Sequence, residues 1–141
     1  MFGILICIAA GAAMSFQGVM NTRLGESIGT GEANAFVQAT AAVLALAVLV
    51  FHRDGSFSAL GGTNWLYMLG GVLGLVITLT VMLGMHALTP ATAVSIILVS
   101  QLLTAGVIDA LGLMGTERVP LTWTKAIGAA LMIAGVVVFK R

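Results

Sequence analysis

Long apolar segments alternate with short polar breaks along the whole chain. The apolar segments cover residues 2–20, 33–51, 65–86, 90–113 and 121–139, and a helix needs about 20 such residues to cross the hydrocarbon core of a bilayer. The segments are continuous, whereas the strands of a membrane barrel would alternate apolar and polar positions. Because backbone in lipid must satisfy its own hydrogen bonds, we expect an all-α membrane protein with five transmembrane helices in one domain, residues 1–141.

Polar and helix-capping residues mark the expected breaks. Residues 21–32 form the longest polar stretch, and the Gly/Ser-rich residues 52–64 separate the second and third segments. Thr89 followed by Pro90 predicts a helix start, because proline suits the first helical position after a threonine cap. Residues 1–10 contain no Lys or Arg, so we expect the first segment to be a retained helix and not a signal peptide.

Composition supports a membrane protein and excludes several other classes. Hydrophobic residues make up 60% of the chain and charged residues 8%, whereas soluble domains carry about 25% charged residues. No basic stripe is present, so we expect no nucleic-acid partner. The lone Cys7 and the separated His52 and His86 predict no metal site. No catalytic residues can be assembled, so we expect neither an enzyme nor a cofactor.

The basic residues give almost no preference for one orientation in the membrane. Five spans place the N-terminus, residues 52–64 and residues 115–120 on one side, and each side then holds three basic residues. Since orientation follows the excess of Lys and Arg in short loops, we hypothesise dual topology. The alternative is a fixed orientation set by weaker cues, in a parallel dimer or a hetero-pair. The two sets are Arg53, Arg118 and Lys125 on the first side, and Arg23, Lys140 and Arg141 on the second.

A chain inserted in both orientations can pair with its own inverted copy, which reproduces the inverted-repeat architecture of many transporters. Five helices would be half of such a structure. Gly128 and Gly135 lie seven residues apart on one face of the last segment, a spacing that suits a left-handed helix crossing. We expect them to form a dimer contact; packing within one chain is the alternative, because small-residue patterns are common in membranes.

A few polar residues interrupt the apolar segments. An ionisable group at the centre of a span costs roughly 2.5 to 3.5 kcal/mol, which makes Asp109 a candidate for coupling or gating. The alternative is an interfacial carboxylate satisfied by Arg118 or by helix-end groups. Gln101 shares a helix face with Asp109 and follows Ser100 near the middle of the segment.

A second polar group is expected nearer the opposite membrane side. It comprises Gln17 in the first segment, Asn34 and Gln38 in the second, and Glu32 at the edge. Amides in these positions either line a solute route or hydrogen-bond one another as structural glue between helices.

The order of several short motifs resembles one transporter family over nearly the full length. The motifs are residues 17–25, Trp65 with Gly70, Gly71 and Gly74, Gln101 with residues 108–112, and a C-terminal part with Pro120, Lys125, Gly128 and Gly135. In these the chain resembles the YdcZ-like, five-helix branch of the drug/metabolite transporter superfamily. The resemblance implies a multi-pass protein of the bacterial inner (cytoplasmic) membrane that transports small organic molecules.

The chain departs from its relatives in two respects. It carries Ser100 and residues 38–40 where the family pattern has glycine. Small multidrug-resistance relatives couple protons through a glutamate in the first helix, which residues 2–20 lack; Asp109 or Glu32 would have to replace it.

We therefore expect a homodimeric transporter of small organic molecules, binding its substrate with Gln17, Asn34, Gln38, Ser100 and Gln101 and using Asp109 or Glu32 for coupling. Its partners would be the solute, the lipid bilayer and a second copy. A dual-topology ion channel and a non-transporting helper subunit of a membrane complex are the alternatives.

Overall fold

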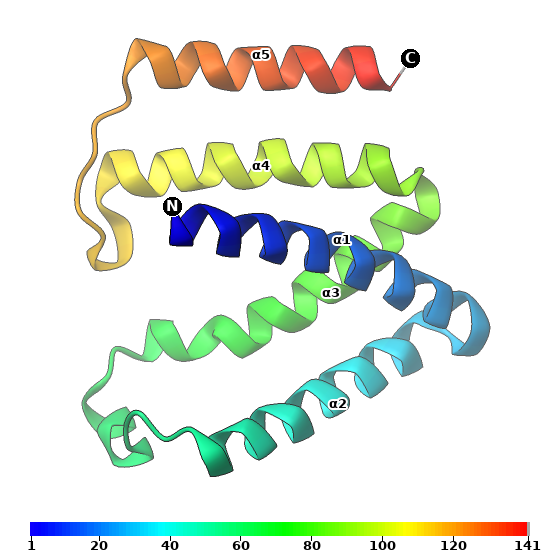
Figure 1. Ribbon diagram of the computed structural model, residues 1–141, viewed down its shortest axis with the longest axis vertical. Helices are drawn as coiled ribbons and strands as arrows, with labels where there is room; N and C mark the ends of the chain where they lie inside the picture. The colour runs from blue at the N-terminus through cyan, green and yellow to red at the C-terminus, as the bar shows by residue number, and fades with distance from the viewer. Residues whose placement is uncertain (141) are drawn as a thin grey trace. The chain divides into compact units, whose positions relative to one another are not determined.

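The computed structural model describes residues 1–140, and every regular element in that range is a helix (Figure 1). This confirms the expected all-α class. The α-helices are α1 (Phe2–Ile28), α2 (Thr30–Phe51), α3 (Gly70–Ala87), α4 (Pro90–Leu111) and α5 (Trp123–Phe139); the short 3-10 helices are η1 (Phe57–Gly62), η2 (Trp65–Leu69) and η3 (Leu113–Gly115).

Four helical segments are long and apolar enough to cross a membrane. They are α1, α2, the continuous segment Trp65–Ala87 that joins η2 to α3, and α4. Helix α5 is apolar but has 17 residues, which at about 1.5 Å per residue gives about 25 Å. That length is less than the roughly 30 Å of a typical hydrocarbon core.

The polar stretch at residues 21–32 is mostly helical, and this differs from the break expected there. Helix α1 continues through it to Ile28, and α2 begins at Thr30. The Arg23–Glu26 ion pair, with 2.8 Å between Nη1 and Oε2, and a hydrogen bond from Ser27 Oγ to the Arg23 carbonyl support the extra turns. The polar residues thus mark where the helix leaves the apolar slab, and they do not end it. The turn itself needs only Gly29, whose φ of 99° favours glycine.

Capping residues define the other helix ends. Thr89 caps α4 by accepting a hydrogen bond from the Thr92 N–H, with Pro90 as the first helical residue. Thr122 caps α5 by accepting a hydrogen bond from the Lys125 N–H. The helix therefore begins at Trp123, two residues later than the expected start. The third segment begins as a 3-10 turn after Asn64, so its α-helical part starts only at Gly70.

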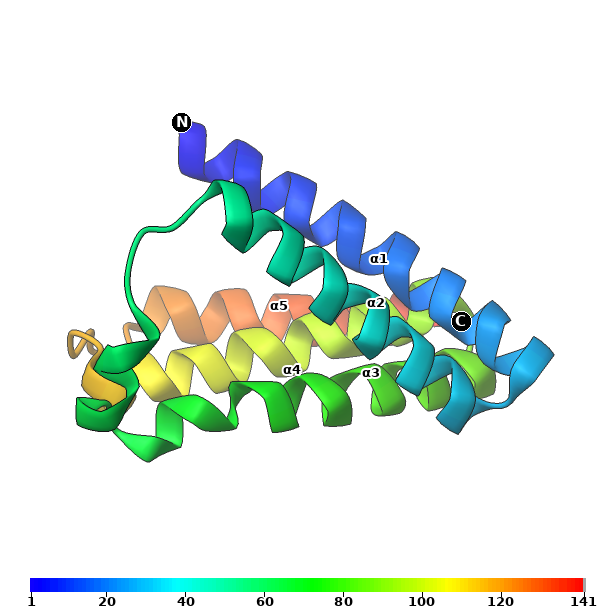
Figure 2. The ribbon, with the colours of Figure 1, turned by 90° about the horizontal axis from the view of Figure 1, so that it is seen from below.

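The chain divides into two compact units, Met1–Ala87 and the residues from Leu88 onward. In the first unit α1, α2 and α3 converge at the end that holds Gly29 and Ala87 and diverge toward their other ends (Figures 1 and 2). The helices bury residues only where they converge. The buried residues of the unit are Gly18, Asn21, Thr22, Ala33, Asn34, Met82 and Met85.

In the second unit α4 and α5 run side by side (Figure 1). The connection between them folds back on the end of α4. The Asp109 carbonyl accepts hydrogen bonds from the Gly112 and Val119 N–H groups, and Arg118 Nε donates to the Ala110 carbonyl at 3.1 Å. Gly112, at φ 62°, is the left-handed residue that ends α4.

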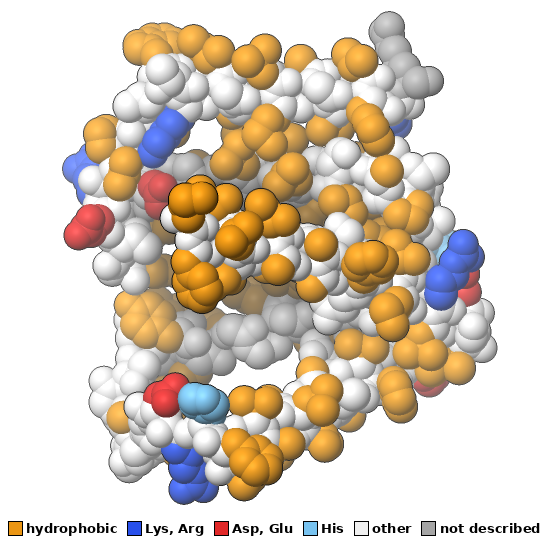
Figure 3. All heavy atoms as spheres, in the orientation of Figure 1, with side chains coloured by type: hydrophobic (Ala, Val, Ile, Leu, Met, Phe, Trp, Pro, Cys, Tyr) orange, Lys and Arg blue, Asp and Glu red, His pale blue; other side chains and the backbone are white. Residues whose placement is uncertain are grey.

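Large apolar side chains remain exposed along all five α-helices. Figure 3 shows hydrophobic side chains over the visible lengths of the helices, with charged groups gathered near helix ends. Phe2 is 79% exposed and Trp123 is 86% exposed. Soluble monomers rarely expose apolar patches of more than a few hundred Å², so this surface is suited to lipid or to another membrane helix.

Candidate functional site

Where helices α1 and α3 pack together, α1 contributes glycines and α3 contributes methionines. A Cβ placed on Gly18 would lie 2.6 Å from Met85 Cε, and one on Gly25 would lie 2.7 Å from Met82 Cε. The two glycines are seven residues apart and therefore share a face of α1. Their missing side chains allow the close helix approach that drives association in lipid.

Three polar side chains are buried beside this contact. Asn21 is 9% exposed, Thr22 is 8% exposed and Asn34 is 5% exposed. Thr22 Oγ1 donates to the Gly18 carbonyl at 2.8 Å, within its own helix. Asn34 Oδ1, in contrast, is buried without a hydrogen-bond partner. Leaving such a group unsatisfied costs about 1–3 kcal/mol, which makes Asn34 a candidate for a role other than packing.

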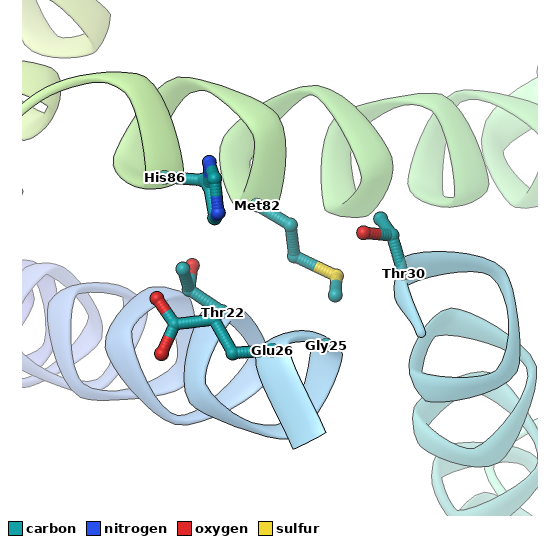
Figure 4. A pocket seen from close by; sticks show the side chains of 6 residues that line it. All are labelled: Thr22, Gly25, Glu26, Thr30, Met82 and His86. Carbon is teal, nitrogen blue, oxygen red and sulfur yellow. The ribbon is translucent and has the colours of Figure 1, made fainter. Parts of the chain in front are cut away.

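A small pocket opens at the same end of the three-helix unit. Its volume is about 70 Å³, enough for about two water molecules at roughly 30 Å³ each. Figure 4 shows Glu26 of α1 and His86 of α3 on opposite walls, with Thr30 of α2 to one side. The full lining is Thr22, Gly25, Glu26, Thr30, Met82 and His86.

The expected site residues of the first unit lie in different environments. Asn34 is in the buried end, and Gln38, one turn further along α2, is half-buried. Gln17 is exposed although its neighbour Gly18 is buried. Glu32 is exposed in the first turn of α2, where its carboxylate lies over Gly29. An acidic group there interacts favourably with the helix dipole.

The expected site residues of the second unit all belong to α4. Ser100 and Gln101 are exposed, and Asp109 is half-buried in the last turn. Arg118 is directed to the Ala110 carbonyl, and within residues 1–140 no ion pair joins it to the Asp109 carboxylate. The ion pair between Arg118 and the Asp109 carboxylate, the alternative considered for Asp109, is therefore not formed within these residues.

The glycines expected at a dimer contact face open space. A Cβ on Gly128 or Gly135 would meet no other side chain or element within 4 Å, and the same holds for Gly70 and Gly74. These faces stay accessible to a second membrane helix.

Sequence reasoning missed the residues that make the best-defined structural features. Glu26 falls within the predicted polar break, and His86 lies at the end of a predicted span with no sign of a partner. Gly18 and Gly25 have the same spacing of seven as Gly128 and Gly135, so this signal is present in the sequence. The pocket needs the three-dimensional approach of α1 to α3, and spacing within one segment does not reveal it.

Comparison with known proteins identifies a family for this chain. Neither a search of curated proteins nor a search of solved structures finds a match to this chain. A family model described as "Putative inner membrane exporter, YdcZ" matches residues 2–138. The match covers nearly all of the helices described above, α5 included. The chain therefore belongs to the YdcZ family of inner membrane exporters.

Proposed function

We propose that two copies of this chain form an exporter of small organic molecules, with the solute cavity between them. The observation that carries the proposal is the small size of the pocket inside one chain, compared with the cavity that an exporter of organic molecules needs. The three-helix unit holds a pocket of about 70 Å³, whereas pockets for drug-sized ligands measure about 300–1,000 Å³. A second copy supplies the missing wall.

Packing within the first unit supports a pair. Helix α1 has no buried residue before Gly18, and α2 has none after Asn34. The divergent ends of these helices therefore offer apolar surface to a partner. An inverted partner agrees with the even division of basic residues and with the inverted repeats of other transporters. Gly128 and Gly135 of α5 provide the close contact between copies.

A five-span arrangement completes this proposal. Helix α5 has 17 residues, and a short span is accommodated by local thinning of the bilayer at modest cost. Lys140 at its end reaches the interface with its long side chain.

The solute would contact amides and a hydroxyl. Donors and acceptors for uncharged polar groups would come from Gln17, Asn34, Gln38, Ser100 and Gln101, while the surrounding apolar surface binds the rest of an amphipathic solute. Asp109 carries coupling or gating, since it is the carboxylate within the apolar length of α4. Glu32 is the second candidate for this role.

Flux into liposomes containing the purified protein tests the proposal. A panel of radiolabelled neutral, cationic and anionic organic solutes should include one whose uptake saturates and exchanges against unlabelled solute. Conductance without saturation would instead indicate a channel, and absence of any flux a helper subunit. Gln101→Leu should reduce uptake, whereas Thr40→Val should not, because the Thr40 hydroxyl bonds to the Phe36 carbonyl of its own helix.

A further inference from the structure

The pocket between α1 and α3 contains two titratable side chains from different helices. Glu26 comes from α1 and His86 from α3, and both line the same space of about 70 Å³ (Figure 4). The pocket is too small for an organic solute, yet it has room for about two waters. Water in such a space can connect a carboxylate to an imidazole that it does not touch.

Charged residues of α1 and α2 lie at the same end of the unit as His86. Helix α1 contributes Glu26 together with Arg23, which binds Glu26 Oε2 at 2.8 Å. Glu26 also lines the pocket. Helix α2 contributes Glu32, which lies over Gly29. His86 is the titratable residue of α3, and Tyr67 of η2 belongs to the opposite end of the unit.

Neighbouring polar groups extend inward from this pocket. Thr30 lines it, and Asn34 lies one turn deeper on the same face of α2. Asn34 Oδ1 is buried and lacks a partner. Buried oxygens of this kind are usually satisfied by ordered water, and Asn34 itself does not line the pocket.

We propose that this pocket is a proton-binding site that closes the convergent end of the three-helix unit. A proton from solution binds the imidazole of His86, and the resulting cation pairs through water with the carboxylate of Glu26. The pair ties the end of α3 to the end of α1. Loss of the proton to solution breaks this pair and releases the end of α3 from the end of α1. The site's effect on export rests on the proposed function, whereas the proton-dependent contact does not.

The helix contact beside the pocket is suited to small movements. Met82 and Met85 place flexible thioether ends against Gly25 and Gly18, and methionine adapts to altered packing at low cost. Helix shifts at such contacts are commonly about 1–2 Å. A shift of this size at Gly25 would change access to Thr30 and Asn34.

Distances between spin labels on α1 and α3 test the proposal. Labels on Ser27→Cys and Ala87→Cys, in full-length protein with Cys7→Ala, lie near the pocket but do not line it. In nanodiscs, lowering the pH from 8 to 5.5, the range in which histidine gains its charge, should shorten and narrow the label distance by about 1–2 Å. Glu26→Gln and His86→Gln should each abolish the response.

Two variants serve as controls. His52→Gln removes the other histidine, which lies 3.9 Å from Asp54 in the loop after α2, and Glu32→Gln removes the other nearby carboxylate; both should keep the response. A distance that ignores pH in the parent protein, or a response that survives in His86→Gln, overturns the proposal. Normal solute flux in a protein whose label distance does not change with pH refutes the proton site alone. A pH-dependent label distance in a protein without solute flux refutes only the transport function.

Discussion

Met85 lies over Gly18 so closely that a Cβ on the glycine would come within 2.6 Å of the methionine Cε. Seven residues along the same face, Gly25 stands in the same relation to Met82. Hydrocarbon provides no hydrophobic force to hold helices together, so such close contacts carry the association of α1 with α3. The buried polar residues and the small pocket depend on this contact for their positions.

Overfilling the contact should destabilise the first unit. Gly18→Leu inserts a side chain where a thioether already lies, and we expect a loss of about 1–3 kcal/mol in the free energy of unfolding. Met85→Ala should offset part of that loss in the double variant, by at least about 1 kcal/mol relative to additivity. Gly11→Leu is the control, because a Cβ there meets nothing within 4 Å. Unfolding in mixed micelles compares the parent with all four variants, and strictly additive losses would argue against the contact.

Replacing the unsatisfied amide of Asn34 should separate stability from transport. Asn34→Leu has similar volume and removes a buried oxygen without a partner, so stability should be kept or rise by about 1 kcal/mol. Solute uptake should fall, since the amide is assigned to the solute. The two quantities are measured on one preparation by unfolding and by liposome flux. A large loss of stability with uptake unchanged would make Asn34 a structural residue.

Gly112 should tolerate little substitution. Its φ is 62°, and a Cβ placed on it would lie 3.3 Å from the Thr116 carbonyl oxygen, so we expect a loss of about 1–2 kcal/mol for Gly112→Ala. Gly84→Ala, in an open helix interior, should instead gain about 0.5–1 kcal/mol. Thermal unfolding in detergent compares the two variants. Faster hydrogen exchange at the Val119 N–H would locate the damage at the end of α4; equal effects at both glycines would contradict the argument.

Much of the fold follows from the sequence because lipid imposes a simple rule on it. Apolar length identifies the four long spans, and the Thr89 and Pro90 pair locates the start of α4. The end of α1 is harder to predict, since hydropathy reports where a helix leaves the bilayer and not where it stops. Local pairs such as Arg23 with Glu26 continue the helix into water, and the chain then turns at Gly29 alone.

The candidate site follows less well from the sequence. A polar residue within a span is easy to notice, but its surroundings depend on which helices approach it. Gln17 and Asn34 look equivalent in the sequence, yet the first is exposed and the second is 5% exposed. Glu26 and His86 are 60 positions apart in the numbering, and only the approach of α3 to α1 brings them to one pocket.

Asp109 should control the pH dependence of export. Asp109→Asn keeps the size of the side chain, and the hydrogen bonds at this residue are made by its backbone carbonyl, so the fold should be retained. The profile of solute flux against pH should lose part of its slope, because the variant has no carboxyl proton to exchange at this position. Glu117→Gln, in the exposed connection to α5, should leave the profile unchanged. An unaltered profile in Asp109→Asn would remove this residue from the mechanism.

Orientation in the membrane is open to a direct assay. Reporters fused to the C-terminus should give signal from both sides of the inner membrane if equal basic charge leaves insertion undecided. Adding two lysines to the connection between α4 and α5 should then shift most of the signal to one side. Signal from one side only in the parent chain would exclude dual topology.

Co-reconstitution of active and blocked copies tests the shared cavity most directly. Gln101→Trp, on an exposed face of α4, should obstruct the cavity of any pair that contains it. Mixed with the parent chain in equal amounts, it should leave about one quarter of the saturable uptake if two copies enclose each cavity. A residual uptake of about one half would mean that each chain works alone and would contradict a cavity formed between two copies.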